Sequence, residues 1–269
     1  RSISNFVPKN KIKKSPKAPL VLVYCRNCRL LQLQHSAPEA LMYRKFYWYR
    51  SGITKIMQLG LKNIFEESLK HAKLKKNDVV LDIGANDGIW LSNSTYFIQA
   101  GFSGLLVEPH PQTFNKLKHT WPNSRILNAT SSITDSNKQT NLNNQRVTIV
   151  NVAVGYHRGK GKMIDRGHLI DKTQSIVDES LDGDVIIVPF PELLQRANVP
   201  KHFAVLTFDI ECAAIDYARF VEAIITAGWN PEYLILELKE NHIAKAAVEK
   251  LGFQYLKTMR YDDIFSRIS

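Results

Sequence analysis

Short apolar runs alternate with amphipathic segments along most of the chain. Five continuous runs rich in Val, Ile and Leu predict buried strands, at residues 79–83, 104–109, 146–155, 203–211 and 232–239. Apolar positions three and four residues apart predict helices at 87–101, 111–121, 190–200, 214–228 and 242–252. A turn and strand are expected at 157–167, and a closing hairpin at 253–268. This alternation predicts an α/β fold with a mostly parallel, doubly wound sheet and a C-terminal antiparallel hairpin.

The pattern before residue 77 is different, and we expect three parts in the chain. Residues 1–50 form a basic N-terminal extension, in which "VLVYCRNCRLLQLQ" predicts two short strands around a Cys-x-x-Cys turn. Residues 51–76 form a lead-in amphipathic helix, and residues 77–269 form the main domain. The Ser/Thr/Asn-rich stretch at 123–145 is typical of an inserted loop.

The net charge of +11 is unevenly distributed. Residues 1–76 hold 17 Lys and Arg against 3 Asp and Glu, a charge of +14, whereas residues 77–269 hold 19 against 22, a charge of −3. A solvated basic face and attraction to a polyanion, such as RNA or an anionic glycan or lipid, both fit this asymmetry. No apolar run reaches the ~18 residues of a membrane helix. The N-terminal residues lack a signal-peptide core, and three cysteines cannot pair fully, so a reduced, cytoplasmic protein is expected.

The turn after the first predicted strand carries the first specific chemistry. In "VVLDIGANDG" the strand ends at Asp82, and Gly84 and Gly88 give bare backbone on either side of Asp87. The turn matches neither the G-x-G-x-x-G dinucleotide loop nor a P-loop, and it has no lysine. Acids here disfavour a pyrophosphate and suit a cationic ligand, for which S-adenosylmethionine, with its sulfonium and ammonium groups, is the natural candidate.

The second strand supports that ligand. "LLVEP" ends at Glu108, 26 residues beyond Asp82, where an acid accepts hydrogen bonds from both ribose hydroxyls. The carboxyl ends of parallel strands meet at one edge of the sheet, so both acids are expected there. Loop acids that are merely solvated or cap a helix are the other interpretation.

Five motifs together resemble the FkbM family of S-adenosylmethionine-dependent methyltransferases over residues 77–269. They are "LDIGANDG", "LLVEPHPQTFNKLK", "VTIVNVAVG", "LTFDIECAAID" and "YLILELK". The resemblance implies a class I (Rossmann-like) methyltransferase fold and methyl transfer to hydroxyls of sugars or related small acceptors. It places the cofactor on Asp82, Gly84, Asn86, Asp87, Glu108, Pro109, Asn151, Ala153 and Asp209, with Asn151 and Ala153 near the adenine.

The family's Asp-x-Glu-Gly signature appears here with cysteine in place of glycine, as Asp209-Ile210-Glu211-Cys212. Three roles remain open for its acids: general base toward an acceptor hydroxyl, ligands of Mg²⁺ or Mn²⁺, or hydrogen-bond partners of the cofactor amine. Glu237, at the end of the fifth strand, and His242 are further catalytic candidates on the same edge. An exposed or capping histidine is the plainer interpretation for both His242 and His110.

The N-terminal Cys-x-x-Cys has a resemblance of its own. Residues 18–57 resemble the start of bacterial deoxysugar C-methyltransferases, whose four-cysteine zinc module has a further Cys-x-x-Cys upstream. Cys25 and Cys28 are half of such a site, and tetrahedral zinc needs four ligands. We therefore expect no zinc at these two cysteines.

O-methylation of a sugar or glycan hydroxyl is the function these features favour. An RNA or cap 2′-O-methyltransferase is the first alternative, because the basic N-terminal region and "FYWY" suit nucleic acid. A non-catalytic scaffold that kept the fold is the second, and Cys212 is its best support.

Overall fold

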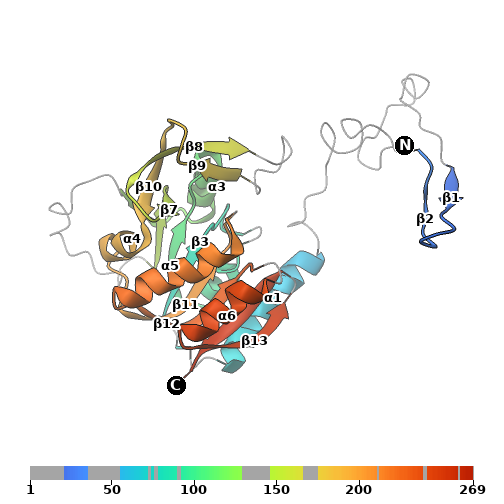
Figure 1. Ribbon diagram of the computed structural model, residues 1–269. Coiled ribbons are helices and arrows are strands. Elements are labelled where there is room, and N and C mark those ends of the chain that lie inside the picture. Colours follow the sequence, from blue (N-terminus) through green and yellow to red (C-terminus); the bar gives the residue numbers. More distant parts are fainter. Residues whose placement is uncertain are drawn as a thin grey trace. The chain divides into compact units, whose positions relative to one another are not determined.

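The computed structural model describes residues 21–35, 55–71, 74–75, 78–89, 92–128, 146–165, 175–210, 212–238, 241–259 and 261–268 (Figure 1). The chain divides into two compact units. One comprises residues 1–50 with 165–173, and the other comprises residues 51–164 with 174–269.

The described part of the first unit is a short hairpin. Strands β1 (Leu22–Tyr24) and β2 (Leu31–Leu33) pair antiparallel, as predicted around the Cys-x-x-Cys turn. The turn is closed by Arg29, whose N–H donates to the Cys25 carbonyl and whose φ is 59°. Both strands expose their leucines, so the pair buries little apolar surface. Two such strands are only marginally stable by themselves.

Eight strands of the second unit's described residues form one sheet. Their order is β13-β14-β12-β11-β3-β4-β6-β5. The strands β3 (Val79–Ile83), β4 (Ser103–Val107), β5 (Arg125–Leu127), β6 (Val147–Val150), β11 (His202–Phe208) and β12 (Asn230–Leu236) are parallel. The closing strands β13 (Phe253–Met259) and β14 (Asp262–Arg267) are antiparallel. The direction of strand addition reverses at β3, because the chain adds β4 on one side and β11 on the other. This confirms the predicted fold class.

Helices cover both faces of this sheet. The helices α4 (Phe190–Arg196), α5 (Ala214–Thr226) and α6 (His242–Lys250) share one core with the residues of β3, β11 and β12 that point to their side. The helices α1 (Lys55–His71), α2 (Thr95–Gln99) and α3 (Pro111–Thr120) contribute to two cores of the opposite face. The sheet strands are therefore buried on both sides, which explains their continuous apolar sequences.

The expected single strand at 146–155 is wrong, because two strands of different sheets occupy it. β6 belongs to the large sheet, and β7 (Ala153–Gly155) begins a four-stranded sheet of order β7-β10-β8-β9. Its other strands are β8 (Gly159–Asp165), β9 (Ser175–Asp178) and β10 (Val185–Pro189). The break follows from Asn151, whose side-chain amide donates to the carbonyls of Glu108 at 2.8 Å and Pro109 at 3.0 Å.

The helix predicted at 87–101 is also wrong over most of its length, because α2 covers only Thr95–Gln99. The preceding polar side chains are drawn into buried hydrogen bonds: Ser92 and Ser94 to Asp82, and Asn93 to Thr207 and Asp262. Such side chains compete with helical backbone bonding. Gly101, at φ 104°, ends the helix as expected.

The predicted insertion at 123–145 contains one short strand. β5 lies at the edge of the large sheet and pairs with β6. Residues 129–145 lie outside the described residues.

Candidate active site

Four predicted site residues fall in one row across the carboxyl edge of the large sheet. Leu236 aligns with Phe208, Phe208 with Ile83, and Ile83 with Val107. The residues that follow these four positions are Glu237, Asp209, Gly84 and Glu108. These four residues, three acids and the glycine between them, are called the acid row. Ligands of open α/β sheets bind outside this edge at the point where strand order reverses, which here is β3.

Gly84 lets the turn pass very close to the neighbouring strand end. Its φ is 94°, and a Cβ placed there would lie 1.9 Å from the Asp209 carbonyl oxygen. The N–H groups of Gly84 and Ala85 both donate to the Val107 carbonyl, at 2.9 and 3.0 Å. Asn86, at φ 52°, continues the turn. Because residue 84 has no side chain, this turn can lie directly against the Asp209 end of the acid row.

Glu108 is held by backbone N–H groups on both carboxylate oxygens. Oε2 accepts from Asn86 at 3.0 Å and Oε1 accepts from His110 at 2.8 Å. The side chain is 7% exposed. Burial raises the pKa of this carboxyl to about 7, with the two backbone N–H groups opposing the rise and Asp82 and Asp87 adding to it. A ligand hydroxyl that donates to Glu108 would favour the ionised form.

Asp82 lies beneath the turn, 1% exposed. Its Oδ2 accepts from Ser92 Oγ at 2.7 Å and Ser94 Oγ at 2.6 Å. Burial raises the pKa of this carboxyl, and the two serines partly oppose the rise. These bonds connect the end of β3 to the segment before α2, a structural role of Asp82 that the sequence analysis did not predict. The polar Ser92-Asn93-Ser94 stretch, which interrupts an otherwise amphipathic segment, was the sequence feature that could have indicated it.

Neighbouring residues brace the Glu108 loop. Asn151 bonds the carbonyls of Glu108 and Pro109, and Ala153 begins β7 shortly beyond it. His110 caps α3, because its Nδ1 accepts from the N–H groups of Gln112 and Thr113. The buried His110 therefore has the capping role that the sequence allowed.

The Asp209 end of the row is anchored by a residue that the sequence did not single out. The Asp209 N–H donates to Ile83 O at 2.9 Å, while the Tyr217 hydroxyl accepts from Ile210 N at 3.2 Å and donates to Ile210 O. Burial raises the pKa of Tyr217, and the charges of Cys212, Asp209 and Glu237 raise it further. An aromatic residue on the inner face of α5 is an ordinary core pattern, so no sequence signal marked it.

The remaining candidates are placed less centrally. His242 is exposed on the first turn of α6, next to the capping residue Asn241. Asp87 is half-buried and accepts from the Ile89 N–H at 3.1 Å. Glu211 lies outside the described residues.

The donor set of this row fits S-adenosylmethionine. Glu108 presents a carboxylate fixed by two backbone N–H groups, as ribose hydroxyls require, and Gly84 leaves open backbone beside it. Half-buried acids at Asp209 and Glu237 suit the positive end of the molecule. Among the described residues, no three His, Cys, Asp or Glu side chains gather as metal ligands. Nor is any described helix long and apolar enough to cross a membrane.

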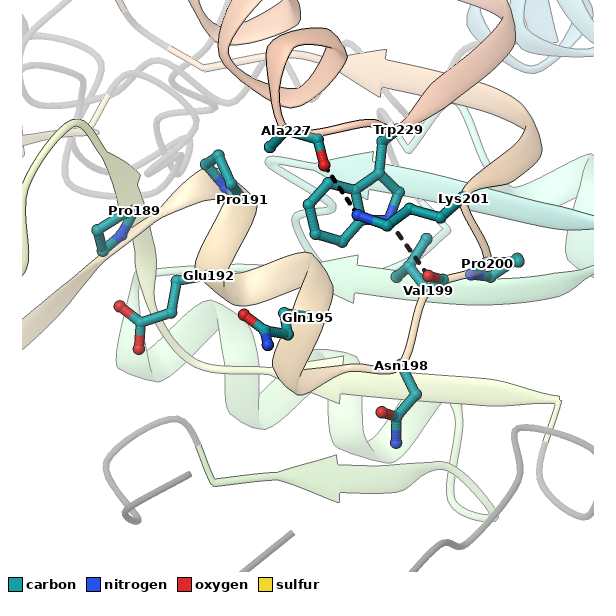
Figure 2. Close-up of a pocket in the computed structure, with 10 residues that line it drawn as sticks. All are labelled: Pro189, Pro191, Glu192, Gln195, Asn198, Val199, Pro200, Lys201, Ala227 and Trp229. Atoms are coloured by element: carbon teal, nitrogen blue, oxygen red, sulfur yellow. Dashed lines mark hydrogen bonds between the residues drawn. The ribbon is translucent and has the colours of Figure 1, made fainter. Parts of the chain in front are cut away.

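A pocket of about 810 Å³ lies at the opposite edge of the sheet (Figure 2). It is formed by α4 and by residues that precede β11 and β12, including Lys201 and Trp229. The Lys201 ammonium lies 3.2 Å from the Trp229 ring centroid and donates to Ala227 O, and the indole N–H donates to Val199 O. This pocket is therefore separate from the row of acids.

The family model described as the Methyltransferase FkbM domain matches residues 82–244. Among solved structures, the methyltransferase FkbM of Methylobacillus flagellatus KT is 13% identical, with a TM-score of 0.42, covering 72% of this chain and 44% of its own. The chain thus spans less than half the length of that protein. Aeropyrum pernix fibrillarin, solved with natively bound S-adenosyl-L-methionine, is 12% identical, with a TM-score of 0.36, covering 75% of this chain and 72% of its own.

A search of the curated proteins found no match. The family model spans more than half of the chain, from Asp82 within β3 to the first turn of α6. It thereby includes every member of the acid row. The chain belongs to the FkbM family of S-adenosylmethionine-dependent methyltransferases.

Proposed function

We propose that the chain O-methylates a hydroxyl group of a sugar or glycan. The observation that carries the proposal is the row in which Asp209 and Glu237 stand beside the cofactor turn at Gly84. An alcohol becomes a nucleophile only as its proton leaves, and a carboxylate next to the methyl donor can accept that proton. The sugar class follows from the resemblances of the main domain and of the N-terminal Cys-x-x-Cys segment.

The residues take the following roles in this proposal. S-adenosylmethionine, when bound, supplies the electrophilic methyl group. Glu108 holds the ribose, Gly84 and Asn86 shape the turn, and Asn151 supports the Glu108 loop. Asp82 holds the turn from below through Ser92 and Ser94. Asp209, with Glu237 and Glu211 as further acids, orients the acceptor hydroxyl and takes its proton. Alignment of the two reacting groups supplies most of the acceleration.

The test is incubation with labelled S-adenosylmethionine against nucleotide sugars, free glycans and capped RNA. We expect label on a sugar acceptor, and alkaline stability of that label would identify an ether rather than an ester. Label on RNA alone would overturn the sugar assignment. The absence of cofactor binding in calorimetry would show a scaffold instead.

The role of Asp209 has its own test, once an acceptor is found. At saturating S-adenosylmethionine, Asp209→Asn should lower kcat by roughly 10²-fold or more, as for loss of a general base. If the acids hold a cation, EDTA should abolish turnover and Mg²⁺ or Mn²⁺ should restore it. Full turnover by Asp209→Asn would remove the residue from the mechanism. The cytoplasmic location stays a prediction.

A further inference from the structure

The segment that carries Asp209 is fixed from two sides. On the β3 side, Asp209 N donates to Ile83 O, and the Asp209 carbonyl lies where a side chain at Gly84 would collide with it. On the α5 side, the Tyr217 hydroxyl bonds both the N–H and the carbonyl of Ile210. The Cys212 N–H also donates to Ile210 O, at 2.9 Å.

Tyr217 is itself rigidly placed. It is 1% exposed, and its ring packs edge-on against Phe208, the last residue of β11, with centroids 5.8 Å apart. Its hydroxyl both donates to and accepts from the backbone of Ile210, seven residues earlier in the chain and next to Asp209. Core packing requires only the ring. The hydroxyl adds nothing to the apolar contact, and burying it without its bonds to Ile210 would cost free energy.

We infer that Tyr217 is a positioning residue for methyl transfer, which fixes the backbone at Ile210 so that the neighbouring Asp209 side chain stays in the acid row. The inference rests on the proposed role of Asp209.

A local probe tests the fixation without any acceptor. Cys212 is half-buried within the segment, so its alkylation rate with iodoacetamide reports both how well the folded segment shields the thiol and how often the segment opens. Tyr217→Phe should raise the Cys212 alkylation rate roughly 5- to 30-fold, because it removes both buried hydrogen bonds of the hydroxyl. Mass spectrometry of the tryptic peptides separates Cys212 from Cys25 and Cys28. An unchanged Cys212 rate would overturn the inference.

The matched control is Tyr255→Phe. It removes a hydroxyl that bonds Thr258 Oγ1 at 2.8 Å, on β13 rather than at the 209–212 segment. This variant should alkylate at Cys212 as slowly as the parent chain, even if its melting temperature falls equally. Equal acceleration in both variants would mean general loosening and would also overturn the inference.

A double-mutant cycle separates this inference from the proposed function. With the acceptor that the panel identifies, Tyr217→Phe should lower kcat roughly tenfold with little change in the acceptor KM, and Asp209→Asn/Tyr217→Phe should be no slower than Asp209→Asn. Additive losses would show that Tyr217 does not act through Asp209. Full turnover by Asp209→Asn with faster Cys212 alkylation in Tyr217→Phe would remove the catalytic role of Asp209 but keep the fixation of the segment.

Discussion

At the residue scale, Glu108 couples the proposed cofactor site to pH. Its pKa of about 7, raised mainly by burial, lies above the usual 4.5 of a glutamate, so the folded chain holds this proton more tightly than the unfolded chain. The contribution of Glu108 to stability is therefore most favourable below about pH 4.5 and is lost as pH rises toward 7. Ribose hydroxyls need the ionised form, so cofactor binding and proton release are linked.

We predict that affinity for S-adenosylmethionine rises roughly tenfold between pH 6 and 8, because binding selects the ionised carboxylate. Calorimetry in buffers of different ionisation enthalpy should show about one proton released near pH 6. Glu108→Gln should bind more weakly and lose this pH dependence. Glu108→Ala should weaken binding by about 1.5–3 kcal/mol. A flat profile in the unaltered chain would contradict a ribose contact at Glu108.

The glycines of the chain offer a graded test of backbone geometry. Gly84 combines φ 94° with a Cβ position 1.9 Å from the Asp209 carbonyl oxygen, Gly252 has φ 90° with nothing within 4 Å, and Gly159 has neither feature. Glycine-to-alanine substitution at these three positions therefore separates backbone strain at positive φ from steric overlap of the new Cβ.

We predict that Gly84→Ala lowers the free energy of unfolding by about 2–5 kcal/mol, since strain at positive φ adds to a forced shift of backbone. Gly252→Ala should lower it by only about 1–2 kcal/mol, and Gly159→Ala should leave it nearly unchanged. Urea denaturation of the three variants measures the order. Equal effects at residues 84 and 252 would show that the turn does not press against Asp209.

At the scale of elements, α6 is joined to the antiparallel end of the sheet by a buried ion pair. The ammonium of Lys245 on α6 lies 2.7 Å from Oδ1 of Asp263 on β14, and Asp263 is fully buried. The same carboxylate accepts from Thr258 on β13. Three elements therefore meet at one charge pair, next to the strand that carries Glu237.

We predict that Lys245→Met destabilises the chain by about 3–5 kcal/mol, because it leaves the Asp263 carboxylate buried and unpaired. Lys245→Met/Asp263→Leu should recover much of this loss, because neither charge then remains inside. Urea melts of the single and double variants give the coupling. Strictly additive losses would argue that the two side chains do not interact in solution.

At the scale of the whole molecule, the proposed cofactor site lies within the second unit. Every described member of the acid row, and Tyr217, falls within residues 51–164 and 174–269. The described hairpin of the first unit is small and exposes Leu22, Tyr24, Leu31 and Leu33. The strongly basic part of the sequence, residues 1–76, overlaps mainly the first unit.

We predict that a chain starting at residue 51 melts cooperatively and binds S-adenosylmethionine within about twofold of the full chain, since no described member of the row is removed. An isolated 1–70 fragment should show no cooperative melting, because a two-stranded hairpin and one helix bury too little apolar surface. Circular dichroism and calorimetry measure both. Loss of cofactor binding on truncation would place residues 1–50 in the site.

The sequence by itself determined the alternation of strands and helices, because apolar period depends on neighbouring residues alone. It also located Asp82, Gly84, Glu108, Asp209 and Glu237 near strand ends, since parallel strands bring those ends to one edge. Only the tertiary structure decided that Ser92, Asn93 and Ser94 leave the predicted helix. Asn93 bonds Thr207 and Asp262, which are 114 and 169 residues away.

The same reason explains the other differences. Asn151 divides an apolar run into strands of two sheets because its partners are carbonyls at residues 108 and 109. Tyr217 has the pattern of any buried aromatic residue, and only its contact with Ile210 gives its hydroxyl a role. Local pattern thus fixed which residues are buried and where strands end, whereas the choice of polar partners across the fold needed the three-dimensional arrangement.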